Sequence, residues 1–202
     1  PTPTLTPTPT VTATPPAGAE AITCERVIVK EAGKLAQVRI GALAACETRV
    51  LEGKLPPATI CATETKTAAK IAKAVSRLGS KIAQACGGAD RTCNVLDGDE
   101  PSLGEIGWGV SACPGFEGNG CDGALVDCDD VGGCVACIGE AAIAQATALA
   151  FGVAPAPAGS AEAKCQVAIG AATADFFKAR ATALAKCADA QIRGRASGPC
   201  PD

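Results

Sequence analysis

Thirteen Cys residues are the side chains that could do the most chemistry in this sequence, which contains no His. Without His, a haem-attachment motif, a His-bearing zinc site and a Ser–His–Asp or Cys–His nucleophile are excluded. Cys134 and Cys137 form a CxxC motif, which at the start of a helix could act as a redox pair. No βαβ pattern surrounds it, so we interpret each Cys as half of a structural disulfide with another Cys. A four-thiolate zinc site on Cys128, Cys134 and Cys137 lacks the second CxxC motif it would need.

Acidic side chains gather in the Gly-rich middle of the chain. The group is Asp97, Asp99, Glu100, Asp127, Asp129 and Asp130. Such carboxylates bind calcium in many exported proteins, and a pair of them could also serve a glycosidase. The sequence matches no calcium-loop pattern and favours no carboxylate pair. We therefore expect solvated loop acids, with calcium binding as the alternative, and no catalytic residue, cofactor or resident metal.

Composition excludes further function classes. The net charge is -3 and aromatic residues make up 2%, so the chain lacks the basic surface and stacking rings of a nucleic-acid-binding protein. The scarcity of rings also argues against a carbohydrate cleft or an apolar pocket. No uninterrupted run of 18 apolar residues is present, so we expect no membrane span.

The Cys content predicts the compartment. Thirteen Cys in 202 residues is typical of exported proteins, in which most Cys are paired. We therefore expect an extracellular or cell-surface protein, either a mature product after removal of its export signal or a fragment of a longer chain. Because the count is odd, one thiol is either free or cross-links two subunits.

Residues 1–19 form a Thr/Pro-rich arm. Pro lacks the amide donor and disfavours helix in the residue before it, so we expect a polyproline II rod about 50 Å long. Tracts rich in Thr and Pro are typical acceptors of O-linked glycans, and a plain spacer is the alternative. The expected acceptors are Thr2, Thr4, Thr6, Thr8, Thr10, Thr12 and Thr14.

Hydrophobic periodicity predicts a mainly α fold, a disulfide-stapled bundle of helical hairpins. Helices are expected over residues 21–53, 65–86, 135–151 and 160–193. The third is expected to bury Ile138, Ala142, Ala146 and Leu149. Residues 87–134 are rich in Gly, Asp and Cys, and we expect an irregular loop subdomain with Trp108 in its small core. The predicted organisation is an arm (1–19), a hairpin (20–86), this subdomain (87–134) and a helical pair (135–202).

An internal repeat is the most specific feature of the sequence. Residues of the first helix recur 141 positions later in the fourth, with Cys spacing, apolar face and final Gly preserved. The matched pairs include Cys24 with Cys165, Ile28 with Ile169, Leu35 with Phe176, Arg39 with Arg180, Cys46 with Cys187 and Gly53 with Gly194. The first copy continues into a second helix but the second copy does not, so it is a half unit that cannot bury its own face. An ordinary four-helix bundle with a duplicated element is one interpretation, and a repeat completed by another subunit is the other.

Helix geometry predicts three disulfides. Cys24 and Cys46 lie about 33 Å apart on one helix and cannot pair with each other. In an antiparallel hairpin, Cys24 lies opposite Cys86 and Cys46 opposite Cys61, and the repeat then pairs Cys187 with Cys200. The partners of the other seven stay open: Cys93, Cys113, Cys121, Cys128, Cys134, Cys137 and Cys165. An Ala-rich core with few aromatic rings buries little area, so such cross-links are needed for stability.

Three segments carry a resemblance to known proteins. They are CQVAIGAATADFFKARATALAKC (165–187), TAAKIAKA (67–74) and CVACIGEAA (134–142). Together they resemble a group of uncharacterised, exported, Cys-rich helical repeat proteins from environmental bacteria. The resemblance covers most of residues 24–200 but not the Thr/Pro arm. It implies a helical, disulfide-bonded fold and carries over no activity or site residue.

These patterns predict a non-enzymatic structural protein. We expect a secreted, disulfide-stapled subunit of an extracellular assembly, a glycosylated filament in which copies of the chain are each other's partners. The first alternative is a secreted or stalk-tethered binding or adhesion module that uses the Cys-rich loops. The second is a redox protein or enzyme that uses Cys134 and Cys137 or a pair of loop acids.

Overall fold

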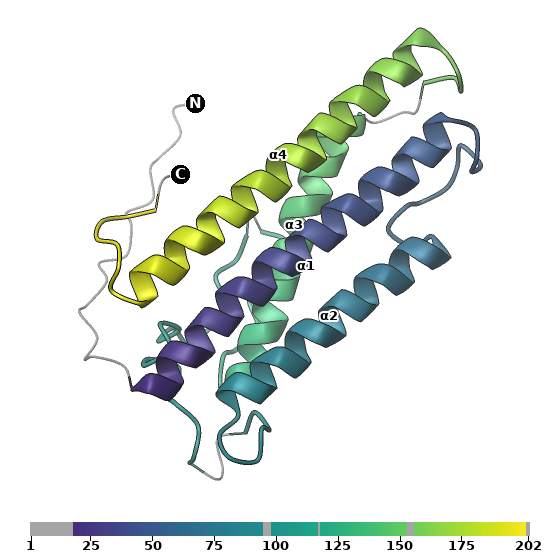
Figure 1. Ribbon diagram of the computed structural model, residues 1–202. Helices are drawn as coiled ribbons and strands as arrows, with labels where there is room; N and C mark the ends of the chain where they lie inside the picture. Colours follow the sequence, from purple (N-terminus) through teal and green to yellow (C-terminus); the bar gives the residue numbers. More distant parts are fainter. Residues whose placement is uncertain (1–17, 95–97, 117, 153–155, 201–202) are drawn as a thin grey trace, which may run out of the picture.

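The fold is mainly helical. The computed structural model describes residues 18–94, 98–116, 118–152 and 156–200. Within these ranges lie α1 (Ala19–Leu51), α2 (Thr65–Cys86), α3 (Cys128–Phe151) and α4 (Ala161–Ile192), and the only β pairing there is an isolated bridge between Ala112 and Ala124. Figure 1 shows α2, α1 and α4 side by side with α1 in the middle, while α3 runs behind and contacts all three.

Polar side chains fix where the helices begin. The Glu64 carboxylate accepts the amide hydrogen of Thr67 at 2.8 Å and caps α2. The Ser160 hydroxyl accepts the amide hydrogen of Ala163 at 3.1 Å and caps α4. These contacts satisfy amide groups that have no partner within the helix. Both helices lie within a residue of their predicted bounds.

The start of α3 differs from the prediction. The helix begins at Cys128 rather than Val135, because Asp127 and Asp130 form a reciprocal capping box ahead of the Gly pair. Gly132 continues the helix, and a β-carbon there would lie 3.3 Å from Ile82 Cδ1, so its small size lets α2 approach. The predicted boundary at residue 134 therefore falls inside α3.

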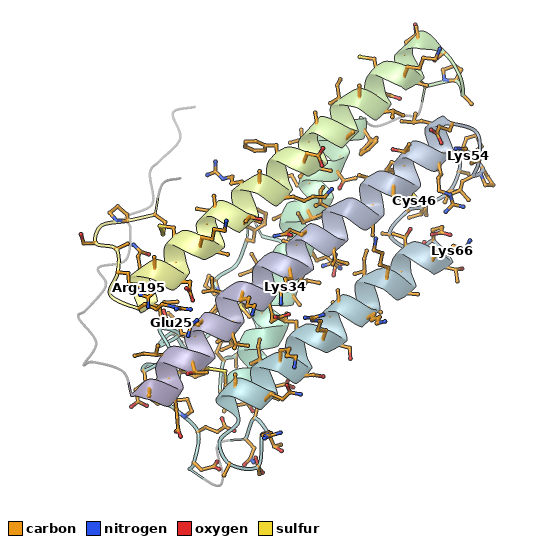
Figure 2. The ribbon with its side chains drawn as sticks, in the orientation of Figure 1. Glu25, Lys34, Cys46, Lys54, Lys66 and Arg195 are labelled. Carbon is orange, nitrogen blue, oxygen red and sulfur yellow. A yellow bond between two sulfur atoms is a disulfide. The ribbon has the colours of Figure 1, made fainter. Side chains whose placement is uncertain are left out.

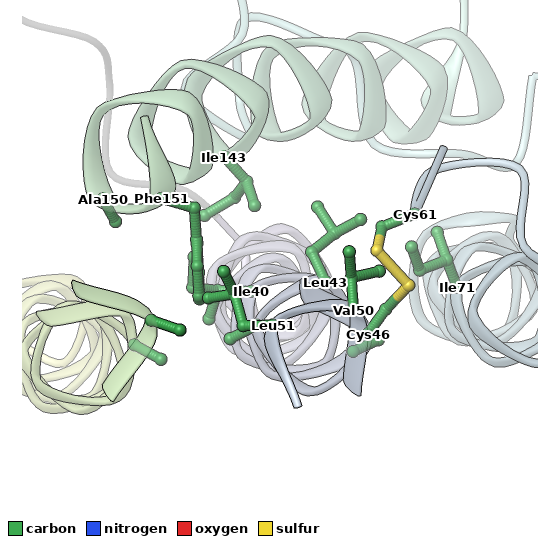
Figure 3. Packing of buried hydrophobic residues seen from close by; sticks show 14 residues of the cluster. Ile40, Leu43, Cys46, Val50, Leu51, Cys61, Ile71, Ile143, Ala150 and Phe151 are labelled. Carbon is green, nitrogen blue, oxygen red and sulfur yellow. A yellow bond between two sulfur atoms is a disulfide. The ribbon is translucent and has the colours of Figure 1, made fainter. Parts of the chain in front are cut away.

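The buried face of α3 is also different. The helix buries Ile143, Ala146, Thr147, Ala150 and Phe151, whereas Leu149 is 82% exposed. Because ten of its 24 residues are Ala or Gly, several faces fit a three-and-four spacing. Figure 3 shows Phe151 reaching from α3 toward Ile40 and Leu51 of α1, and this contact sets the rotation of the helix.

The helices share two main clusters of buried side chains. One surrounds the Cys46–Cys61 disulfide at the end of α1, with Leu43, Val50 and Ile71 (Figure 3). The other joins the start of α1 to the end of α2 and also includes Ile106 from the loop region. Trp108 packs against this second cluster and against a small one around Cys113 and Cys134. The irregular region is therefore continuous with the helical core.

Candidate functional site

All thirteen Cys residues lie in the described ranges, and twelve of them form disulfides. Cys24–Cys86, Cys46–Cys61 and Cys187–Cys200 are the three pairs expected from helix geometry and the repeat. The other three pairs connect the irregular region to α3: Cys93–Cys128, Cys113–Cys134 and Cys121–Cys137. Cys165 on α4 is the free thiol, and it is exposed.

The CxxC motif does not form a dithiol pair. Cys134 and Cys137 are bonded separately to Cys113 and Cys121, so each joins the loop region to the first turns of α3. Neither sulfur carries a titratable proton in this state, and a nucleophilic thiol at the motif would first require reduction. The motif is arranged as a structural cross-link.

The acidic residues of the irregular region lie at separate positions. Asp127 and Asp130 cap α3, and Asp99 accepts the amide hydrogen of Ala89 at 2.7 Å. Asp97 lies outside the described residues. Among the residues that are described, no group of three or more acids or Cys is placed to hold a metal ion. The expected glycan acceptors, Thr2 to Thr14, also lie outside the described residues.

Helix α3 is long and apolar enough to cross a membrane, judged by length and composition alone. The expectation of no membrane span is based on the absence of an uninterrupted apolar run, and Asp129, Asp130 and Glu140 interrupt this helix. Its three Cys residues are bonded to Cys residues of the irregular region. In this fold α3 packs against the other three helices.

The two copies of the repeat, α1 and α4, pack against each other as an approximate two-fold pair. Gln37 Nε2 donates to Thr182 Oγ1 at 3.2 Å, and a β-carbon on Gly41 would lie 3.6 Å from Lys178 Cε. By the 141-residue offset, Thr182 corresponds to Gly41 and Lys178 to Gln37. The same positions therefore meet reciprocally, as in an isologous contact between two identical subunits.

Helix ends support this antiparallel pairing. Near the start of α1, Arg26 Nε bonds Asp189 Oδ1 near the end of α4 at 2.6 Å. Figure 2 shows the two ends together, marked by Glu25 on α1 and by Arg195 just after α4. The hydrogen bond from Arg26, with the positive charges of Arg26 and Arg193, holds the pKa of Asp189 below its usual value.

The two-fold relation breaks down on the outer side of each helix. In α1, the face that bears Cys24, Ile28 and Leu35 is covered by α2 and bonded to it through Cys86. Over the corresponding face of α4, no helix lies among the residues that the structure describes. We call this face the outer stripe of α4; it comprises Cys165, Ile169, Ala172, Phe176, Ala179 and Ala183, all exposed.

Exposed fractions measure the difference between the two copies. Ile28 is 2% exposed and Leu35 is 3% exposed, whereas their counterparts Ile169 and Phe176 are 49% and 58% exposed. A monomer gains nothing from placing Phe and Ile in water at positions where the repeat otherwise forms a core. The outer stripe is therefore the candidate functional site.

The stripe is uncharged along its whole length. The only charged member of the α1 face, Glu31, is replaced by Ala172 in α4. Glu31 is 5% exposed and pairs with Lys34 and with Arg77 of α2 at 3.2 Å. A face without this carboxylate requires no basic partner, which favours a purely apolar contact.

The sequence repeat could have identified Cys165 as the unpaired Cys. Its counterpart Cys24 is predicted to bond Cys86, and no helix equivalent to the one that carries Cys86 follows α4 in the described residues. The repeat therefore singles out Cys165 as the Cys whose equivalent partner is absent from the described residues. Its position on an exposed apolar stripe required the α1–α4 packing to be known.

Comparison with known proteins adds no relative. No family model matches the chain, and no similar curated protein or solved structure was found.

Proposed function

We propose that the protein is a non-enzymatic structural subunit of an extracellular assembly, a self-associating filament that carries O-linked glycans on its Thr/Pro arm. The observation that carries this proposal is the exposed outer stripe of α4, whose equivalent residues Cys24, Ile28 and Leu35 are buried in the first copy of the repeat. Burial of apolar surface is the dominant favourable term in association. The stripe supplies such surface at the edge of the three-helix layer, where another subunit can reach it (Figure 1).

The covalent framework supports an extracellular role. Six disulfides in one small domain are typical of proteins that fold in an oxidising compartment. Cys24–Cys86 joins α1 to α2, and three others join the irregular region to α3; such cross-links stabilise a subunit against unfolding. A rigid unit of this kind suits a protein whose role is mechanical.

A filament requires more than one contact per subunit. A single isologous contact closes at a dimer and cannot propagate. In our proposal the second contact comes from residues 1–19, an extended Thr/Pro segment that reaches a neighbouring subunit and leaves its glycans in solvent.

The test is the size and mass of the purified full-length chain. We expect elongated particles by negative-stain microscopy, sedimentation faster than that of a monomer, and a ladder of hexose masses on the intact protein. A monodisperse monomer at high protein concentration would contradict the assembly role. A single unmodified mass would contradict the glycan assignment alone.

One observation favours a binding or adhesion module as the second candidate. Three of the six disulfides hold the irregular region against α3, and Val110 and Val126 are exposed there. Rigid loops that present apolar side chains are a common contact surface. This candidate predicts a stable monomer that binds a surface through these loops.

A further inference from the structure

The first copy of the repeat shows what kind of element covers the face equivalent to the outer stripe of α4. In the first copy of the repeat, α2 lies over the equivalent face of α1, with Leu78 and Ile82 buried and Cys86 bonded to Cys24. The approximate two-fold relation between α1 and α4 places an equivalent helix over Cys165, Ile169 and Phe176. No helix of the described residues lies over this stripe, and a second copy of the chain carries a face of the same chemistry that can cover it.

The α2 helix of a second copy cannot serve as this cover. Its apolar face is already buried against α1 of its own chain, and Cys86 is already in a disulfide. The α4 helix of a second copy is free to do so. It exposes the same unpaired thiol and the same stripe, whose six members carry no charge, so the stripe members themselves bring no like charges together.

We propose that two copies of the chain pair through their outer α4 stripes and form an intermolecular disulfide between their Cys165 residues. This inference depends on the proposed assembly function and specifies one of its contacts. It also accounts for the odd number of Cys, because the thirteenth sulfur then has a partner.

Side-chain spacing sets the direction of the two helices. Cys165, Ala172 and Ala179 recur at intervals of seven, as do Ile169, Phe176 and Ala183. This heptad spacing is that of a two-stranded coiled coil, and in a parallel pair each residue of the stripe meets its own copy across the axis. An antiparallel pair centred on Cys165 would leave Phe176 uncovered, because α4 begins at Ala161. The helices are therefore parallel.

Apolar surface continues beside the stripe onto α3. Leu149, which is 82% exposed, lines a groove between α3 and α4 together with Ile169 and Phe177. A second copy seated on the stripe would cover part of this groove. The contact is therefore wider than a single helix face.

Formation of the bond is a balanced two-electron oxidation. A disulfide oxidant of the compartment, of the class that also forms the six internal disulfides, accepts the two electrons. One Cys165 thiolate attacks it and forms a mixed disulfide with release of one oxidant thiol. The Cys165 thiolate of the second copy then attacks the protein sulfur, which releases the second oxidant thiol. Two protein S–H bonds are lost, one S–S bond is formed, and the oxidant is reduced to two thiols.

The first experiment measures the covalent state of the full-length chain, purified without reductant and incubated with oxidised glutathione. We expect a dimer on a denaturing, non-reducing gel that Cys165→Ser abolishes. Phe176→Glu, which leaves Cys165 in place, should lower the dimer yield at least tenfold by introducing charge into the stripe. Ile60→Glu is the matched control, because Ile60 is 69% exposed and lies off the stripe; it should leave the yield unchanged.

The second experiment tests the direction of the helices in a Cys165→Ser background. Ala172→Cys should restore the covalent dimer, because residue 172 meets its own copy in a parallel pair. Asp175→Cys is exposed but lies off the stripe, and should not restore it. Circular dichroism of each variant verifies that the helices are intact, so a lost dimer is not mistaken for a lost fold.

The outcomes separate this inference from the proposed function. If the chain forms large particles while Cys165 stays fully alkylatable or carries only glutathione, the pairing is wrong and the assembly role stands. Equal dimer yields for Phe176→Glu and Ile60→Glu would also overturn it. If the Cys165 dimer forms as expected but no larger particle appears, the pairing is correct and the filament is not.

Discussion

Glu31 is the most buried carboxylate on α1, and its environment determines the charge it carries. Burial raises its pKa, but the hydrogen bond from Lys34 and the positive charges of Lys34 and Arg77 outweigh that effect and lower the pKa overall. A carboxyl group whose pKa is lower in the folded state stabilises the fold above its unfolded pKa. That stabilisation is lost as the pH falls through the folded value. The ion pairs therefore help to hold α2 against α1 at neutral pH.

Replacement of this charge tests the assignment. Glu31→Gln should lower the free energy of unfolding by about 1–2 kcal/mol at pH 7, because Lys34 and Arg77 lose their partner but are themselves solvated. The difference from the unmodified protein should shrink as the pH falls through the lowered folded pKa of Glu31 and the carboxyl group becomes protonated. Urea denaturation at pH 7 and pH 3 measures both values. A difference that is the same at both pH values would contradict an electrostatic role.

Glu47 provides a control of opposite sign on the same helix. Burial raises its pKa, and no basic residue offsets the effect. The charged form is therefore destabilising above the folded pKa, and the penalty disappears below the unfolded pKa. Glu47→Gln should make the protein as stable or more stable at pH 7 and leave it unchanged at pH 3. A loss of stability at pH 7 equal to that of Glu31→Gln would show that both variants act through packing.

At the scale of elements, the contact between α3 and α4 depends on the absence of a side chain at Gly170. A β-carbon there would lie 2.0 Å from Phe151 Cζ, and Phe151 is 6% exposed. Gly170→Ala should therefore cost about 1–3 kcal/mol through overpacking, even though Ala favours helix by about 1 kcal/mol. Thermal unfolding of the variant measures the net effect.

Gly139 on α3 is the matched control for this substitution. A β-carbon there meets nothing within 4 Å, so only the helix preference operates. Gly139→Ala should stabilise the protein by up to about 1 kcal/mol. If both substitutions stabilise the protein, the α3–α4 contact can adjust and does not set the helix position.

The sequence predicted most element boundaries but not the start of α3. Apolar residues at steps of three and four locate α1, α2 and α4, although in α4 the large members Ile169 and Phe176 are exposed. The Gly-, Asp- and Cys-rich composition predicts an irregular loop up to residue 134, with Asp127 and Asp130 as solvated loop acids. Their spacing of three is also that of a capping box, and that alternative could have been recognised. The rotation of α3 about its axis could not be predicted, because an Ala-rich helix has no single dominant face.

At the scale of the whole molecule, the sequence predicted the hairpin and its disulfides but not the α1–α4 pair. Cys spacing and the opposite directions of α1 and α2 determine which sulfurs meet. The α1–α4 contact depends on small residues such as Gly33 and Gly41, which leave no signal in hydrophobic periodicity. Without that contact, the outer stripe cannot be distinguished from a buried face. The candidate site can therefore be recognised only when the packing of α1 against α4 is known.

The disulfides contribute unequally to the stability of the molecule. Cys24–Cys86 closes a separation of 62 residues, and its two Cys are 0% and 1% exposed. Cys187–Cys200 closes only 13 residues at the end of α4. In the chain-entropy model, Cys24–Cys86 stabilises the folded protein by about 4 kcal/mol and Cys187–Cys200 by about 3 kcal/mol. The first pair also lies in a core cluster, so its removal disrupts packing between α1 and α2.

The two double replacements should therefore differ in the free energy of unfolding that is lost and in how much of the chain is affected. Cys24→Ala with Cys86→Ala should lower the free energy of global unfolding by about 4 kcal/mol or more. Cys187→Ala with Cys200→Ala should cost about 3 kcal/mol or less and should loosen mainly the residues after α4. Chemical denaturation gives the global values, and hydrogen exchange locates the affected amides. Equal losses with equal exchange along all four helices would mean that α4 is bound into the core as firmly as α2. The outer stripe would then be the exposed side of a fully integrated helix rather than of a half repeat at the edge of the fold.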